Sequence, residues 1–164
     1  MNKRGRTKED IFNVLKDRIV TLQYEPGKIL NEIELSEEFG VSRTPIRTVF
    51  QQLESIKLVD IVPRYGVQVA TLNFLNIKSL FEVTKVLDPL ATKLAVSKLT
   101  DEDIKQLKEI VSTLETYDTT KNYQEAILLD EKFHKIVTKS CANPWLIDIL
   151  TDLHCQTERL WHYC

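Results

Sequence analysis

The sequence is poor in the residues that build phosphate loops and disulfide frameworks. It has four glycines in 164 residues, and none of them lies in a glycine-rich nucleotide fingerprint. Its three cysteines, Cys141, Cys155 and Cys164, form neither a C-x-x-C pair nor an even set. A disulfide scaffold is therefore not expected, and the cysteine usage indicates a reducing compartment.

Long apolar runs and an excess of one charge are absent as well. No stretch approaches the length of a membrane span and no secretory signal opens the chain, so we expect a cytoplasmic protein with no membrane partner. The net charge is −2, and affinity for a polyanion must therefore come from a local patch. The basic run at residues 3–8 is either a DNA-touching arm or a solubilising tail.

The sequence also lacks a recognisable catalytic set. It shows no nucleophile with a base and an orienting group, and no second acid suited to general catalysis. We therefore expect a protein that is not an enzyme. On the residues alone two other hypotheses stay open: a helical metal-binding enzyme, and a protein-interaction module that does not bind DNA.

The clearest positive signal is a helix-turn-helix pattern over residues 31–54. Asn31 with Glu34 predicts the start of a short helix whose apolar positions include Ile33, and Gly40 ends it. Ser42 is a suitable N-cap for a second helix. The buried face of that second helix is predicted to comprise Ile46, Val49, Phe50 and Leu53.

The opposite face of the second helix is polar and basic. Such side chains bind base edges and phosphates, although a face of this kind is often merely solvated. The candidate DNA-binding residues on this helix are Arg43, Thr44, Arg47, Thr48 and Gln51.

A β-hairpin is predicted directly after the second helix. Two apolar runs, residues 58–62 and 67–70, flank a turn that contains Pro63, Arg64 and Gly66. A hairpin with a basic tip at this point of the chain is typical of the wing of a winged helix, which makes Arg64 a further candidate DNA contact.

These residues together resemble a known family. The stretch 26–69 reads PGKILNEIELSEEFGVSRTPIRTVFQQLESIKLVDIVPRYGVQV and resembles the DNA-binding domain of the GntR family of bacterial transcription regulators. The resemblance implies that Arg43, Thr44 and Arg47 contact DNA from the recognition helix. It also implies that Gly66 approaches the minor groove. Many members carry an arginine where this chain has Ile33.

From residue 74 onward the sequence pattern is helical only. We therefore expect residues 1–72 to form a winged helix-turn-helix DNA-binding domain and residues 73–164 a helical domain. Helices are predicted at residues 8–24, 73–99, 100–114, 123–140 and 145–160, with Pro89 bending or interrupting the second of these. Its expected buried stripe is Ile77, Leu80, Phe81, Leu87, Leu90 and Leu94. The expected fold is mainly α, with a small β-hairpin wing followed by an antiparallel helical bundle.

The helical half carries a looser resemblance. The segments LFEVTKVLDPLATKLA, LLDEKFHKIV and ANPWLIDIL are similar to the ligand-sensing domain of the FadR-like (FCD) branch of the same family. That domain binds small effectors, and Thr84 stands where a ligand-binding arginine often follows Phe-Glu-Val. Because the family's bundle continues through further helices, we expect this domain to be incomplete at Cys164.

One pair in this half has the spacing of metal ligands. Asp130 and His134 lie four residues apart and share a helical face, although such a pair is more often a surface ion pair. By the resemblance they fall where the first two metal ligands of the FCD domain lie. A third ligand for a zinc, nickel or manganese ion could come from His154, His162 or Cys155, or from a partner subunit.

The resulting hypothesis is a sequence-specific transcription regulator. It would bind a double-stranded DNA operator as a homodimer, because specific recognition usually needs two half-sites. A small organic acid or a metal ion in the helical domain would control it as the effector.

Overall fold

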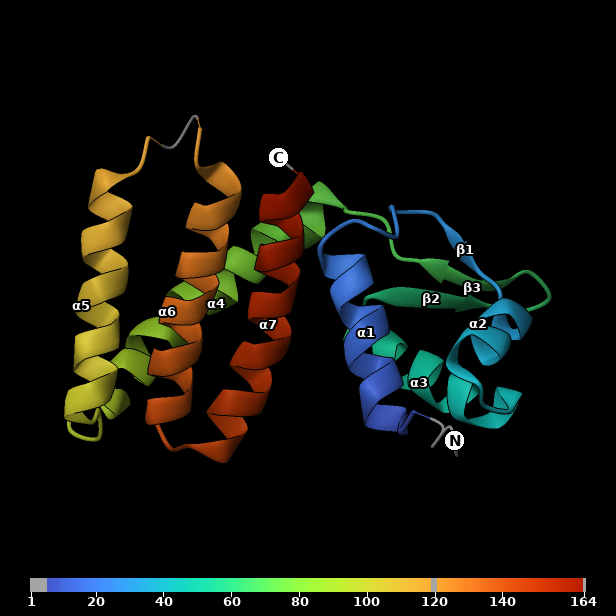
Figure 1. Cartoon of the computed structure of the whole chain (residues 1–164), viewed down its shortest axis with the longest axis horizontal. Coiled ribbons are helices and arrows are strands. Elements are labelled where there is room, and N and C mark those ends of the chain that lie inside the picture. Colours follow the sequence, from blue (N-terminus) through green and yellow to red (C-terminus); the bar gives the residue numbers. More distant parts are fainter. Residues whose placement is uncertain (1–5, 119–120, 164) are drawn as a thin grey trace, which may run out of the picture. The chain divides into compact units, whose positions relative to one another are not determined.

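The computed structural model describes residues 6–118 and 121–163 (Figure 1). Contacts divide the chain into two compact units that meet between Leu72 and Asn73. Residues 3–5 of the basic run and Cys164 lie outside the described residues.

The first unit is a winged helix. Its elements are α1 (Lys8–Val20), β1 (Ile29–Leu30), α2 (Glu32–Phe39), α3 (Arg43–Ser55), β2 (Val59–Val62) and β3 (Gly66–Val69). The predicted start and end of α2 are confirmed: the Asn31 side chain accepts hydrogen bonds from the backbone N–H groups of Ile33 and Glu34, and Gly40 ends the helix in the left-handed conformation. Ser42 is the N-cap of α3 by position but makes no side-chain capping bond.

The wing is part of a three-stranded antiparallel sheet. The predicted hairpin is confirmed, with Val59 opposite Val69 and Val62 opposite Gly66. The strand order is β1-β3-β2. Strand β1 was not predicted, because two residues are too short to show an alternating pattern.

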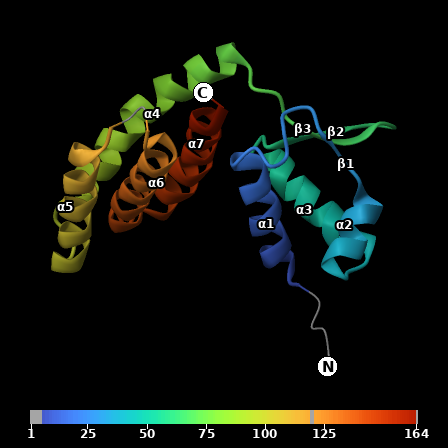
Figure 2. The ribbon, with the colours of Figure 1, turned by 45° about the horizontal axis from the view of Figure 1, so that its top comes forward.

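The core of the first unit lies between α1, α3 and the sheet. In Figure 2, α1 and α3 lie side by side. Fully buried residues of this core include Ile11, Leu15, Ile19, Ile46, Val49, Leu53, Leu58 and Val69. Helix α1 is shorter than predicted, because Leu22 takes a left-handed backbone conformation (φ 58°) that no helix can continue through. Ile33, predicted to be an apolar packing position, is exposed.

The second unit is a bundle of four helices. They are α4 (Phe74–Ala95), α5 (Asp101–Thr116), α6 (Tyr123–Ser140) and α7 (Pro144–Tyr163). A capping box of Thr100 and Asp103 begins α5. Helix α4 runs through Pro89 without interruption. Pro89 is exposed, so water can replace the helical hydrogen bond that proline cannot make.

The core of the second unit forms where α4 crosses α6 and α7 (Figures 1 and 2). Its buried cluster consists of Ala91, Ala95, Val137, Cys141, Leu146 and Leu150. The inward face of α4 therefore carries small residues, which let neighbouring helices approach closely. The prediction that Leu90 is buried was wrong, since that side chain is 44% exposed.

Other large apolar side chains of this unit also face outward. Leu128 is 56% exposed and Trp145 is 81% exposed. None of the helices in the described parts of the chain combines the length and apolarity that a bilayer crossing requires.

Candidate functional site

The first candidate site is the outer face of α3 in the winged helix. Arg43, Thr44, Arg47 and Gln51 are exposed there, and Thr48 is half-buried. They lie opposite the buried Ile46, Val49, Phe50 and Leu53. The amphipathic pattern thus places the predicted DNA-binding side chains on one accessible helix face.

The wing tip is the second accessible part of this unit. Arg64 has a left-handed backbone (φ 69°) and Gly66 has φ 106°, a conformation that favours glycine. Both residues are exposed, and the intervening Tyr65 is 82% exposed. A narrow hairpin with a basic tip is able to enter a groove of DNA.

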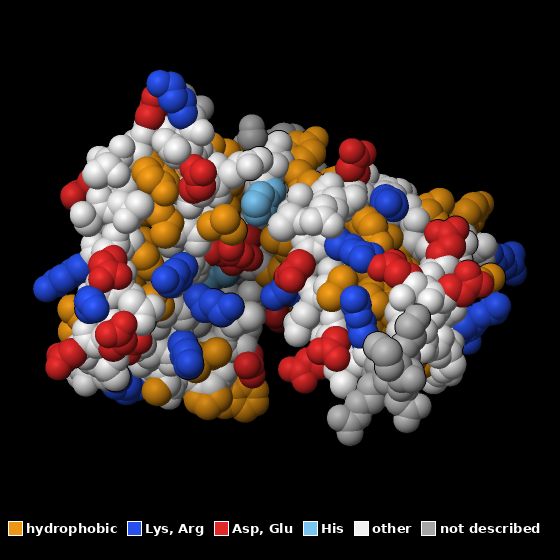
Figure 3. All heavy atoms as spheres, in the orientation of Figure 1, with side chains coloured by type: hydrophobic (Ala, Val, Ile, Leu, Met, Phe, Trp, Pro, Cys, Tyr) orange, Lys and Arg blue, Asp and Glu red, His pale blue; other side chains and the backbone are white. Residues whose placement is uncertain are grey.

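Charge is mixed rather than one-sided on the face of the molecule that Figure 3 shows. Figure 3 shows Lys and Arg side chains interspersed with Asp and Glu on the visible face. The net charge of −2 agrees with this pattern. Because the net charge is negative, affinity for a polyanion must come from a local group of positioned basic side chains.

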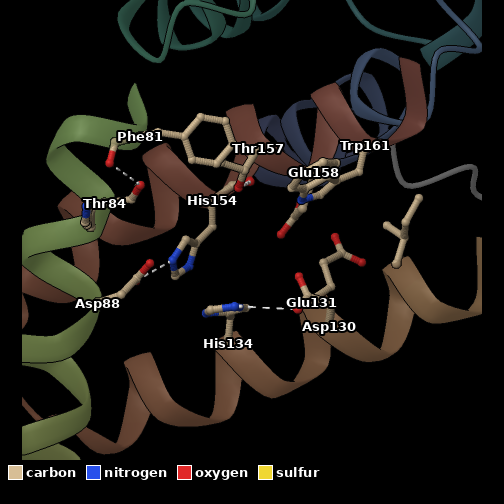
Figure 4. Close-up of a pocket in the computed structure, with 12 residues that line it drawn as sticks. Phe81, Thr84, Asp88, Asp130, Glu131, His134, His154, Thr157, Glu158 and Trp161 are labelled. Carbon is tan, nitrogen blue, oxygen red and sulfur yellow. Dashed lines mark hydrogen bonds and ion pairs between the residues drawn. The ribbon is translucent and has the colours of Figure 1, made fainter. Parts of the chain in front are cut away.

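The helical unit contains a pocket of about 420 Å³ between α4, α6 and α7. The residues that line it recur every three or four positions on each helix (Figure 4). They are Phe81, Thr84, Lys85 and Asp88 from α4; Ile127, Asp130, Glu131 and His134 from α6; and His154, Thr157, Glu158 and Trp161 from α7.

Two carboxylate–imidazole pairs meet in this pocket. His154 Nε2 lies 2.8 Å from Asp88 Oδ1, and His134 Nε2 lies 3.6 Å from Asp130 Oδ1. The two imidazole rings are neighbours, with centroids 4.9 Å apart and ring planes tilted by 58° (Figure 4). One ligand atom each from Asp88, His134 and His154 lies within 4.8 Å of the others.

This donor set suits a divalent transition metal. Imidazole nitrogen and carboxylate oxygen are ligands of zinc and of similar ions, and small side-chain rotations can shorten the separations toward those of a coordinated ion. Each carboxylate can also orient its neighbouring imidazole by accepting a hydrogen bond from the ring N–H. The helical domain therefore contains a His/Asp cluster that can hold a metal ion.

The structure selects among the predicted ligands. Of the three residues considered as a third ligand, His154 lies in the cluster. In residues 6–118 and 121–163, neither His162 nor Cys155 belongs to a group of that kind, and Cys155 is buried. Of the two predicted first ligands, His134 belongs to this group, whereas Asp130 does not and lies 3.6 Å from His134 Nε2 as its neighbour on the same helix.

Sequence reasoning missed Asp88. It lies 46 positions before His134 on another helix, so no local spacing connects the two. A signal was nevertheless present: Asp88 is three and seven positions before the buried Ala91 and Ala95, and four after the buried Thr84. An acidic residue on the buried face of a helix is uncommon and marks a candidate site.

The pocket carries little that would attract a free organic acid. The Thr84 hydroxyl donates a hydrogen bond to the carbonyl of Leu80 in its own helix, at 3.1 Å. Lys85 is the lysine in the lining, which also includes the acidic residues Asp88, Asp130, Glu131 and Glu158. An anion would need a bound metal ion to offset these negative charges.

Comparison with known proteins covers both units. Residues 7–69 match the family model described as "Bacterial regulatory proteins, gntR family", and residues 79–164 match the model of the FCD domain. The chain is 30% identical over 159 residues to the uncharacterized HTH-type transcriptional regulator YdhC of Bacillus subtilis, covering 93% of this chain and 67% of that protein. It is 25% identical over 154 residues, with the same coverage of 93% and 67%, to the HTH-type transcriptional repressor RspR of Escherichia coli.

The solved structures support the same fold. E. coli McbR/YncC superimposes with a TM-score of 0.79 at 22% sequence identity, over 95% of this chain and 74% of that one. A putative GntR regulator from Rhodococcus sp. RHA1 gives 0.75 at 18% identity, again over 95% and 74%. With the two family matches and the similarity to YdhC, the chain belongs to the GntR family of bacterial transcription regulators, and it joins a DNA-binding winged helix-turn-helix to an FCD domain.

Proposed function

We propose that this regulator reads its operator with the outer face of α3 and the tip of the wing, under the control of an effector bound in the α4–α6–α7 pocket. The observation that carries the first half is the joint exposure of the polar residues of α3 over a fully apolar inner face. Recognition helices of winged helix proteins dock in the major groove with such a face.

In this proposal the side chains have distinct roles. Arg43, Thr44, Arg47, Thr48 and Gln51 contact bases and phosphates from α3, and Arg64 with Gly66 contacts the adjacent groove from the wing. Arginine pairs with guanine O6 and N7, while threonine and glutamine reach base edges or phosphates. The measurement that tests this is the salt dependence of binding to a duplex selected by the full chain from a random library.

A DNA-binding protein loses affinity steeply as the salt concentration rises, because its binding releases counterions from the phosphates and added salt opposes this release. We expect such a loss, together with a defined base preference in the selected duplexes. Binding that is independent of salt, or selection that enriches no motif, would contradict the proposal and favour a protein-interaction module.

The second half of the proposal concerns the effector. His134 and His154, with Asp88 and Asp130 beside them, would hold a zinc, nickel or manganese ion, alone or together with a small organic acid. Their three helices, α4, α6 and α7, would then be fixed relative to one another. Coupling to DNA follows if that arrangement differs between the operator-bound and free states.

The experiment for this half is a screen. Zinc, nickel, manganese and small organic acids are added, singly and in pairs, to the complex with the selected duplex, and the change in operator affinity is measured. Allosteric control typically changes affinity by roughly 5–150-fold. If no ligand changes the affinity, the pocket has no regulatory role toward this duplex.

A further inference from the structure

Glu32 and Arg47 form an ion pair within the helix-turn-helix. Arg47 Nε donates to Glu32 Oε2 at 2.8 Å. The hydrogen bond from the guanidinium to the carboxylate raises the pKa of Arg47. Glu32 is the first residue of α2, whereas Arg47 lies in α3. The pair therefore joins the supporting helix to the proposed reading helix at a side chain that would face DNA.

The two members of the pair differ in their access to solvent. The Arg47 side chain is 68% exposed and the Glu32 side chain is 24% exposed. The second carboxylate oxygen, Glu32 Oε1, is buried and makes no hydrogen bond with the described residues. Because Oε1 is covered and Oε2 already accepts a hydrogen bond from Arg47, Glu32 is not placed to accept a hydrogen bond from a base. Its available action is on Arg47.

Binding through Nε leaves the other edge of the guanidinium for a ligand. Arginine has five N–H donors in a rigid planar fork, and guanine presents two acceptors, O6 and N7, that match two parallel donors. A carboxylate at Nε restricts rotation of the plane while Nη1 and Nη2 remain on the outer edge. Arg47 is thereby oriented before DNA arrives, which lowers the ordering cost of a bidentate contact.

We propose that Glu32 is a positioning residue that holds the Arg47 guanidinium for bidentate recognition of guanine. The inference rests on the proposed reading of DNA by α3. It implies a trade between affinity and specificity: a carboxylate near the phosphates weakens binding to every duplex, whereas the orientation it imposes on Arg47 favours the duplex with guanine at the right position.

The test compares two duplexes with the full chain. The first is the duplex selected by the wild type. The second duplex carries another base in place of one guanine. This guanine is the one that is no longer preferred when the selection from the random library is repeated with Arg47→Ala. The measured quantity is the ratio of the two affinities for wild type, Glu32→Gln and Glu37→Gln. Glu37 is exposed on the same helix, so its substitution removes an equal charge without touching the ion pair.

We expect Glu32→Gln to lower this ratio about tenfold, which corresponds to about 1.4 kcal/mol of lost discrimination. The affinity for the second duplex should stay the same or rise. Glu37→Gln should leave the ratio unchanged. In an Arg47→Lys background, Glu32→Gln should no longer alter the ratio, because lysine lacks the fork that the carboxylate orients.

Three outcomes would overturn the inference. If Glu32→Gln and Glu37→Gln both raise affinity for the two duplexes equally, Glu32 only repels phosphate. If Glu32→Gln lowers the ratio as strongly in the Arg47→Lys background, it acts through the fold of α2. If Arg47→Ala keeps the full base preference of the wild type, the proposed reading face is itself wrong.

Discussion

Individual side chains in the pocket make metal binding directly testable. Asp88, His134 and His154 bring ligand atoms within 4.8 Å of one another. An ion that binds only the folded state stabilises it by RT ln(1 + [L]/Kd), about 2.7 kcal/mol at a hundredfold excess over Kd. We expect zinc, nickel or manganese to raise the melting temperature and His134→Ala to abolish the rise.

The matched control for this titration is His162→Ala. His162 lies on α7 with His154 but outside the metal-binding group of the described residues. Its substitution should leave the metal-induced shift intact. A wild type that shows no shift at saturating metal would mean that the two carboxylate–imidazole pairs are structural.

The charges around the pocket predict the order in which ligands bind. Asp88, Asp130 and Glu131 line it together with Lys85, so a free carboxylate meets mainly like charge. We expect succinate or gluconate alone to leave the melting temperature unchanged, and any response to them to require the metal ion. A shift produced by the acid in the presence of a chelator would contradict this prediction.

The contribution of Arg47 to DNA affinity can be measured separately from its orientation. If Arg47 reads a base, Arg47→Ala should weaken binding to the selected duplex by about 1–3 kcal/mol. The control is Lys78→Ala, which also removes one exposed positive charge but lies in α4. Equal affinities of wild type and Arg47→Ala would remove this residue from the reading face.

At the scale of elements, Arg18 ties α1 to α2. Its Nη1 and Nη2 atoms donate to both carboxylate oxygens of Glu38 at 3.0 and 2.5 Å, and Nη1 also donates to the hydroxyl of Tyr24. The guanidinium lies over the ring of Phe39. The hydrogen bond from Arg18 lowers the pKa of Glu38. The packing of the first two helices therefore depends partly on an ionised carboxylate.

This ion pair gives the winged helix a defined pH dependence. Because the pKa of Glu38 is lower in the folded state, the stabilisation is complete above the unfolded pKa of glutamate, about 4.3, and is lost as the pH falls through the folded value. We expect the wild type to lose more stability than Glu38→Gln between about pH 5 and pH 3. The measurement is the melting temperature of both proteins across that range.

Glu37→Gln serves as the control, since it changes an exposed carboxylate of the same helix that forms no ion pair with the described residues. It should follow the wild-type curve. If Glu38→Gln also follows the wild-type curve, the Arg18–Glu38 pair contributes nothing to stability, as is found for many exposed ion pairs.

At the scale of the whole molecule, the prediction concerns assembly. One winged helix covers a single half-site, and specific affinity at physiological salt usually requires two. We propose that the chain, of 19.1 kDa, binds DNA as a homodimer on a pseudo-palindrome. Sedimentation of the complex with the selected duplex should show two chains per DNA. A single chain bound at full affinity would contradict the proposal.

Local sequence signals determined most of the elements. Asn31 and Gly40 delimit α2, the pair Thr100 and Asp103 begins α5, and the predicted helix 123–140 agrees with α6 (Tyr123–Ser140). Caps, turn residues and apolar periodicity act over a few neighbouring positions. These signals can therefore be recognised in the sequence without knowledge of any tertiary contact. They also predicted the winged helix with its hairpin.

The tertiary structure decided which side chains of each helix are buried and which residues distant in the sequence are in contact. The sequence favoured large side chains such as Leu90 for the buried stripe of α4, but Ala91 and Ala95 are buried because α6 and α7 pack closely against them. Asp88 meets His154 across 66 positions. The spacing in the sequence pointed only to Asp130 and His134, of which His134 alone belongs to the cluster. Such contacts depend on the crossing of separate helices, which no periodicity within one helix specifies.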